Sequence, residues 1–188
     1  MNDGLLGFPL GGPPAVGSPA AMVLIGSIEL ENVAASVTFS SIPSTYKHLL
    51  VKWQARCDNA VAANTLLLRM NADTGANYDY AFTSANATFG GTSAVAQTSV
   101  RFGTVQGTSA AANVGAAGTL QISNYKGTTF YKTFHAQLWR QDAATTGGSY
   151  VESSAGHWKS TVAVTSLTIL PSAGNFVVGS RFDFYGAN

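Results

Sequence analysis

Charged residues are scarce in this 188-residue sequence. They make up 10% of the chain, whereas hydrophobic residues make up 46%. An ordinary soluble domain carries about 25% charged residues, and the high apolar content excludes a disordered chain. The polar surface must come mainly from Ser, Thr, Asn, Gln and Gly, and it loses little on desolvation because few ions leave water. We therefore expect other subunits to cover much of it; a neutral, Ser/Thr-rich β protein is the alternative.

A strong charge of one sign is also missing. The net charge is +1, so no strong field gathers nucleic acid or an anionic membrane around the chain. No apolar run approaches the length that spans a bilayer, and no basic stretch followed by an apolar run marks a signal peptide. We expect neither nucleic acid nor a membrane as a partner.

Cysteine occurs once, at Cys57. A single cysteine excludes an intramolecular disulfide and a multi-cysteine metal site. We expect Cys57 to be a half-buried small side chain, since no neighbouring base marks it as a nucleophile. The three histidines, His48, His135 and His157, lie far apart without metal-ligand spacing, so the sequence predicts no metal site from them.

Motifs for catalysis are missing as well. A Gly-x-Ser-x-Gly elbow does not occur, because "GGSYV" and "VGSRF" lack the second glycine. Phosphate-binding loops and the Gly-x-Gly-x-x-Gly fingerprint are absent. The sequence therefore predicts a protein that is not an enzyme and takes no cofactor.

The stretch "NADTGANYD" is the best calcium candidate. Asn71, Asp73, Asn77 and Asp79 stand at alternating positions, where oxygen atoms can hold calcium. It departs from the EF-hand pattern, because Gly75 stands where a ligand is expected and no closing Glu follows. Asn, Asp and Gly also form ordinary turns because they tolerate positive φ. Both interpretations stay open at this point.

Proline and glycine are concentrated in residues 1–21, which hold four of the six prolines and five of the twenty glycines. No period of 2 or 3.6 runs through this segment, so we predict an extended arm. Prolines reduce the entropy that such an arm loses on docking. We expect it to strap a partner or neighbouring subunit; a flexible leader is the alternative. Its apolar, partner-binding side chains are Leu5, Leu6, Phe8, Leu10 and Val16.

From Met22 onward, alternation with a period of two predicts about eight to ten strands separated by Gly/Ser/Asn turns. Between residues 85 and 118 the pattern weakens, with "QTSVRFGTVQG" as its only strand-like part, and we expect long loops or an outlying hairpin there. No capped helical stripe is present. The sequence predicts an all-β, antiparallel two-sheet sandwich, jelly-roll-like, over residues 22–188. Core positions in its two clearest strands are Leu49, Val51, Trp53, Ala55, Phe134, Ala136 and Leu138.

Two tryptophans offer an alternative binding role. Trp139 is predicted on the polar face of its strand near Asp142, and Trp158 beside a turn. Exposed aromatic rings stack on apolar ligand faces, and polar side chains bond to hydroxyl groups. Trp139, Trp158 and Asp142 are therefore candidates for binding a glycan; ordinary packing is the other interpretation of both tryptophans.

Four segments follow one another in a characteristic order: "STYKHLLVKWQAR", "LLLRMNADTGANYDY", "GTLQISNYKGTTFYKTF" and a final stretch that ends "SRFDFYG". This order resembles a group of tailed-bacteriophage virion proteins over about residues 22–186. The resemblance implies fold markers and no catalytic residues. The matching positions are Asn71, Asp73, Gly75 and Tyr78 in the turn, and Ser180, Arg181, Phe182, Tyr185 and Gly186 in the closing strand.

The resemblance implies a non-enzymatic structural protein of the virion. We expect a cement or decoration protein on the capsid surface, a homotrimer whose arm contacts the major capsid protein or other virion proteins. A tail or head fibre component and a receptor-binding module of the tail that grips host glycans are the alternatives. In the closing strand we expect Phe182 and Phe184 to seal the core, while Arg181 and Asp183 on the opposite face pair across strands or with a neighbour at a subunit interface.

Overall fold

The computed structural model describes residues 22–86, 88–142 and 148–188 of the chain. These residues form twelve β-strands and no helix, which confirms the all-β prediction. This part of the chain accordingly has no helix with the length and apolar character to cross a membrane. The predicted arm and its side chains Leu5, Leu6, Phe8, Leu10 and Val16 lie outside the described residues.

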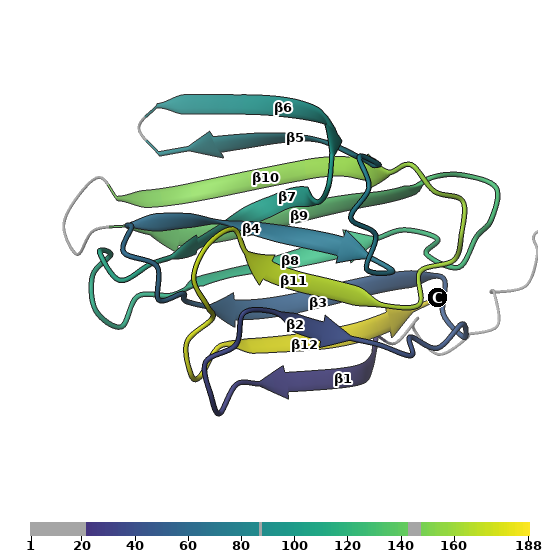
Figure 1. The fold of residues 1–188 in the computed structure, drawn as a ribbon, viewed down its shortest axis with the longest axis horizontal. Helices are drawn as coiled ribbons and strands as arrows, with labels where there is room; N and C mark the ends of the chain where they lie inside the picture. The colour runs from purple at the N-terminus through teal and green to yellow at the C-terminus, as the bar shows by residue number, and fades with distance from the viewer. Residues whose placement is uncertain (1–21, 87, 143–147) are drawn as a thin grey trace, which may run out of the picture.

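Two antiparallel sheets pack face to face (Figure 1). The larger sheet has eight strands, in the spatial order β1 (Val23–Glu29), β12 (Arg181–Ala187), β3 (His48–Ala55), β8 (Ala116–Ile122), β9 (Lys132–Gln141), β10 (Ser149–Trp158), β5 (Tyr78–Ala85) and β6 (Phe89–Gln97). The smaller sheet has four, in the order β2 (Val37–Phe39), β11 (Leu167–Pro171), β4 (Ala63–Met70) and β7 (Val100–Gln106).

The strand order is that of a jelly roll with two additions. β1, β12, β3 and β8 form one four-strand unit, and β2, β11, β4 and β7 form the facing one. In each unit a late strand returns to pair between two early ones, as double Greek-key connections require. The hairpins β5–β6 and β9–β10 extend the first unit beyond β8. The predicted jelly-roll-like sandwich is therefore confirmed.

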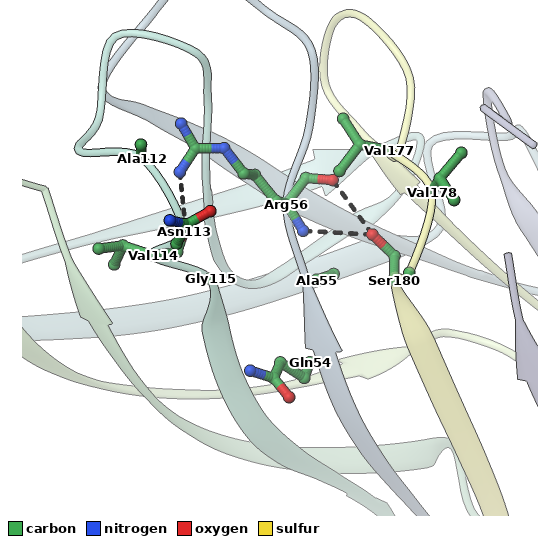
Figure 2. A pocket seen from close by; sticks show the side chains of 11 residues that line it. Gln54, Ala55, Arg56, Ala112, Asn113, Val114, Gly115, Val177, Val178 and Ser180 are labelled. Carbon is green, nitrogen blue, oxygen red and sulfur yellow. Dashed lines mark hydrogen bonds between the residues drawn. The ribbon is translucent and has the colours of Figure 1, made fainter.

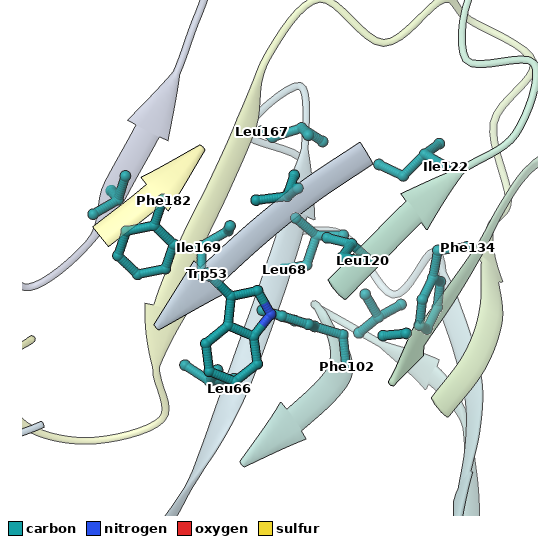
Figure 3. Packing of buried hydrophobic residues seen from close by; sticks show 14 of the residues in the cluster. Trp53, Leu66, Leu68, Phe102, Leu120, Ile122, Phe134, Leu167, Ile169 and Phe182 are labelled. Carbon is teal, nitrogen blue, oxygen red and sulfur yellow. The ribbon is translucent and has the colours of Figure 1, made fainter. Parts of the chain in front are cut away.

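The core lies between the two sheets (Figure 3). Trp53 on β3 meets Phe102 on β7 edge to face, with ring centroids 6.0 Å apart, and Phe182 on β12 packs against Phe176. Removing these rings from water is the main force that joins the sheets. The predicted core positions Leu49, Val51, Trp53, Ala55, Phe134, Ala136, Leu138, Phe182 and Phe184 are all buried.

Several details of the prediction were wrong. A ten-residue strand, β10, ends at Trp158, where the sequence suggested a turn. Its inward positions include Glu152 and Ser154, so the apolar alternation that reveals a strand is missing. Cys57 is fully buried, not half-buried. In the weak region 85–118, the strand-like stretch "QTSVRFGTVQG" does form a strand, β7, whereas β6 was not foreseen and pairs with β5 in a hairpin that begins earlier, at Tyr78.

Candidate functional site

The Asn-x-Asp-x-Gly turn between β4 and β5 forms a hydrogen-bonded clamp centred on Asp73. Asp73 Oδ1 accepts a hydrogen bond from the Gly75 N–H at 2.7 Å. Its Oδ2 accepts bonds from Asn77 Nδ2 at 2.9 Å and from the indole Nε1 of Trp158 at 2.6 Å. Burial opposes ionisation, but these donors together hold the pKa of Asp73 below its ordinary value. The Asp73 carboxylate thus ties the turn to the end of β10.

Tyr78 completes this clamp. Its hydroxyl group accepts a bond from the Met70 N–H at 3.0 Å and donates to backbone oxygens of Met70 and Asp73. Burial raises the pKa of Tyr78 to about 12. Because the oxygens of Asp73 are occupied by N–H donors, the turn has the geometry of a structural element and not of a calcium loop.

Metal-ligating side chains do not gather elsewhere in residues 22–86, 88–142 and 148–188. No group of three His, Cys, Asp or Glu side chains is close enough there to hold an ion. His157 and Lys159 both contact Asp79, with Nε2–Oδ2 and Nζ–Oδ1 distances of 3.3 and 3.0 Å. The Ala96 N–H and Lys159 are the main causes that lower the pKa of Asp79. This cluster is an ion-pair group on the surface of β5 and β10.

A buried ion-pair network joins the two sheets beside β9. Glu152 of β10, 2% exposed, accepts a bond from Arg140 Nε at 2.9 Å and from Thr104 Oγ1 on β7 at 2.7 Å. Arg140 also pairs with Asp142. Burial disfavours the Arg140 cation, but its bonds to Asp142 and Glu152 raise its pKa overall. Asp142, the acidic residue suggested for a glycan site, is therefore engaged by Arg140 in this network.

An open cleft of about 530 Å³ lies beside the end of β3 (Figure 2). Arg56 crosses it, but its guanidinium donates to the backbone oxygens of Ala110, Ala111 and Val114. The Arg56 backbone is held by the Ser180 hydroxyl, which accepts from N and donates to O. Arg56 thus fixes the loop between β7 and β8, and its charge is already engaged.

The outer face of the larger sheet carries polar side chains, among them Lys52, Gln54 and Thr119. A depression of about 460 Å³ crosses β12, β3 and β8 on this face. Small side chains at Ala117 and Thr119 form its floor, and Gln54 stands beside them. On the adjoining strand, Trp139 pairs with Ala117 and is 45% exposed. The predicted exposure of Trp139 is confirmed.

The proposed glycan-binding trio is not brought together. Trp158 is 4% exposed, stacks on Tyr78 and donates its N–H to Asp73, so its assignment to a glycan site was wrong. Burial of Trp158 was missed because β10 itself was missed. Of the two tryptophans, only Trp139 has a ring that a ligand can reach.

The charged residues of the closing strand find partners within the chain. Arg181 Nη1 lies 3.1 Å from Glu29 Oε2 on β1, and its Nε lies 3.1 Å from Asp183 Oδ2. Ser27 also donates to Asp183, at 2.5 Å. The bonds from Arg181 and Ser27 lower the pKa of Asp183. The interface partner that the sequence suggested for this pair is thus not required.

The strand β6 forms one edge of the larger sheet and is exposed at eight of its nine positions. It contains no charged residue and no proline. Phe89 on β6 is 73% exposed and lies in a cross-strand row with Ala85 and the 62% exposed Val151. The sequence analysis missed this apolar row, because its members come from strands that were not foreseen.

The opposite edge strand differs from β6. β1 contains an irregularity between Leu24 and Gly26 and ends on Glu29, which pairs with Arg181. Bulges and charges are the usual protection of an edge against pairing with another chain. β6 has an irregularity only near its end, where Ala96 has a positive φ of 54°. Residues 89–94 thus form a regular, uncharged edge.

The comparisons with known proteins give no identity beyond these observations. The chain matches no protein-family model, no curated protein and no solved structure.

Proposed function

We propose that this chain is a non-enzymatic structural protein of a bacteriophage virion, a decoration protein that cements the capsid surface as a homotrimer. The observation that carries the proposal is the uncharged, exposed edge strand β6. Natural proteins protect such edges unless another chain covers them. A protein whose task is assembly has a use for an open edge, because backbone N–H and C=O groups there pair with a neighbour.

The apolar row beside β6 supports the same role. Phe89 and the 71% exposed Val95 lie on β6 itself, and Val151 lies on β10, on the other side of β5. Exposed apolar side chains that gather as Phe89 and Val151 do mark contact sites on soluble proteins. Burying each of them contributes up to about 1.5–3 kcal/mol before ordering costs are subtracted. Many copies on one particle make a modest contact per copy collectively strong.

The low overall charge and the proline-rich segment support the proposal from the sequence. With 10% charged residues, the surface is easily covered by other subunits. The apolar side chains of residues 1–21 give a second contact with the major capsid protein or another virion protein. The resemblance to tailed-phage virion proteins points in the same direction. A tail or head fibre component is the second candidate, since it needs the same contacts.

A charge placed on β6 tests the proposal. Thr92→Lys puts a cation on the exposed edge and should weaken attachment to phage particles at least about tenfold, as loss of a central contact does. Thr129→Lys is the matched control. It adds the same charge at an exposed position in the loop between β8 and β9, outside β6, and should attach normally. Attachment is measured by co-sedimentation with particles that lack the protein. Normal decoration by Thr92→Lys contradicts a role for this edge.

Deletion of residues 2–21 tests the arm separately. The shortened protein should keep its β circular dichroism spectrum and lose attachment to particles. If the shortened protein still decorates particles normally, the predicted role of residues 1–21 in attachment is wrong. Electron microscopy of labelled virions then separates the capsid surface from a tail or fibre position, and light scattering checks for the mass of three chains.

A further inference from the structure

We infer that the outer face of the larger sheet binds a neutral oligosaccharide along the depression over β12, β3 and β8, with Trp139 on the adjoining strand β9 as a stacking platform at its end. This site shares only Trp139 with the residues that the sequence suggested. Trp139 lies opposite Val151, a member of the apolar row that supports the proposed function, whereas the depression lies over β12, β3 and β8, on the other side of Trp139 from the β6 edge.

The backbone at Trp139 is anchored on both sides. Its neighbours Leu138 and Arg140 point into the protein, where Leu138 is 5% exposed and Arg140 bonds to Glu152. The backbone between two anchored residues in the body of a ten-residue strand has little freedom to move, so the point from which the indole projects is fixed. The ring is 45% exposed, so it offers the apolar faces of sugar rings a surface for stacking.

Polar side chains with free bonding capacity surround this ring. Gln137 precedes Trp139 on the same face, Thr119 pairs with Gln137, and Gln54 lies opposite Ala117. None of these three side chains makes a hydrogen bond to another described residue, in contrast to Ser27, Glu29 and Arg181 on the same sheet. Amides and hydroxyls both donate and accept, which matches the hydroxyl groups of a saccharide.

The charges at the far end of the depression cancel. Arg181 is paired with Glu29 and Asp183, and Lys52 lies over the Tyr185 ring at 5.5 Å from its centroid. Two cations and two carboxylates leave no net charge to attract an anion. A sulfated, sialylated or nucleic-acid ligand therefore gains nothing here, and the site favours a neutral chain.

The dimensions fit a short oligosaccharide. The depression holds about 460 Å³ and is open along the sheet. The strands β12 and β9 are separated by three strand spacings, which is about 14 Å and the length of about two to three hexose units. All strands along this path are already paired on both sides, so a peptide cannot add to the sheet as a further strand.

Tryptophan fluorescence of the full-length protein gives a direct test. Trp53 and Trp158 are buried, so acrylamide quenches Trp139 selectively. Neutral oligomers of glucose, galactose, mannose and N-acetylglucosamine are screened on an array, and those that bind are titrated calorimetrically. At least one should bind with a Kd below about 10 mM and protect Trp139 from quenching.

Variants assign the binding to this site. Trp139→Ala should raise the Kd at least about tenfold, as loss of an aromatic anchor does, and Gln137→Ala about threefold or more. Phe130→Ala, which removes a 75% exposed aromatic ring elsewhere, should leave the Kd unchanged. Circular dichroism confirms that each variant is folded.

Three results overturn the inference: no neutral oligosaccharide binds, binding is unaffected by Trp139→Ala, or only anionic glycans bind. Attachment of Trp139→Ala to phage particles should be normal. If that variant loses attachment and the wild type binds no sugar, the sheet face is a protein interface, which overturns the saccharide site and leaves the proposed structural function standing.

Discussion

Replacing Glu152 by Gln should destabilise the fold more than any change of surface charge. The Glu152 side chain is 1% exposed and bonds to Arg140 and Thr104, while Arg101 Nη2 lies 4.0 Å from its Oε2. The substitution keeps the side-chain volume but removes the negative charge between two arginines. Arg140 retains Asp142 as a partner, whereas Arg101 loses its carboxylate.

The expected magnitude follows from the burial of the network. Removing one partner of a buried ion pair costs about 3–5 kcal/mol, because the other charge stays desolvated. The remaining Arg140–Asp142 pair places Glu152→Gln at the lower end, about 3 kcal/mol. For a domain of this size each kcal/mol lowers Tm by about 2–4 °C, so Tm should fall by about 6–12 °C.

Urea unfolding followed by circular dichroism measures the loss in free energy, and calorimetry measures Tm. Glu29→Gln is the matched control, because Glu29 also pairs with an arginine but its side chain is 58% exposed. The control should unfold as the wild type does, since solvent screens such pairs. Equal unfolding midpoints for Glu152→Gln and the wild type would refute the reasoning that this network depends on its buried charge.

Three further changes test the packing and the turn. Gly156→Ala places a Cβ 2.8 Å from the Tyr80 Cα and should cost about 1–3 kcal/mol in urea unfolding, whereas Gly90→Ala, with nothing within 4 Å, should be neutral. Trp158→Phe removes the N–H that Asp73 accepts and should lower the free energy of unfolding by about 1 kcal/mol. The pKa of Asp73 is lowered in the folded state, so the unfolded chain binds more protons near that pKa. The stabilisation that ionised Asp73 contributes should therefore be fully present above about pH 4 and should be lost as the pH falls through the pKa of Asp73 in the folded protein. Thermal melts at about pH 7, 5 and 3 measure this loss, which should be smaller in Trp158→Phe.

The sequence predicted the sandwich because its central strands alternate cleanly. In β3 every second residue is apolar and buried, and in β9 Phe134, Ala136 and Leu138 follow the same pattern, so their core faces could be assigned from periodicity alone. β10 escaped because Glu152 and Ser154 occupy core positions, and their partners on β7 and β9 cannot be known before the strands are paired. Local patterns therefore predicted the strands whose inward-facing residues are apolar. They failed for the strand whose inward-facing residues form a polar network.

The candidate saccharide site shows the same limit. Exposure of Trp139 follows from the burial of Leu138 and Arg140 beside it, which alternation predicts for Leu138. Its neighbours Gln54, Thr119 and Asp183 come from three other strands, far apart along the chain. Which residues share a row depends on strand order and register, and neither can be derived from the spacing of residues within one strand.

The position of β12 has a consequence for folding. It lies between β1 and β3, so residues 181–187 pair with residues 23–29 and 48–54 from the opposite end of the described chain. Until those late residues leave the ribosome, Trp53 and Leu49 have no neighbour on one side and β1 has no sheet to join. Contacts of such wide separation make folding slow. A nascent molecule thus stays incomplete throughout most of its synthesis. A product stopped before residue 181 would expose apolar strands with unpaired edges and would be prone to aggregation and proteolysis.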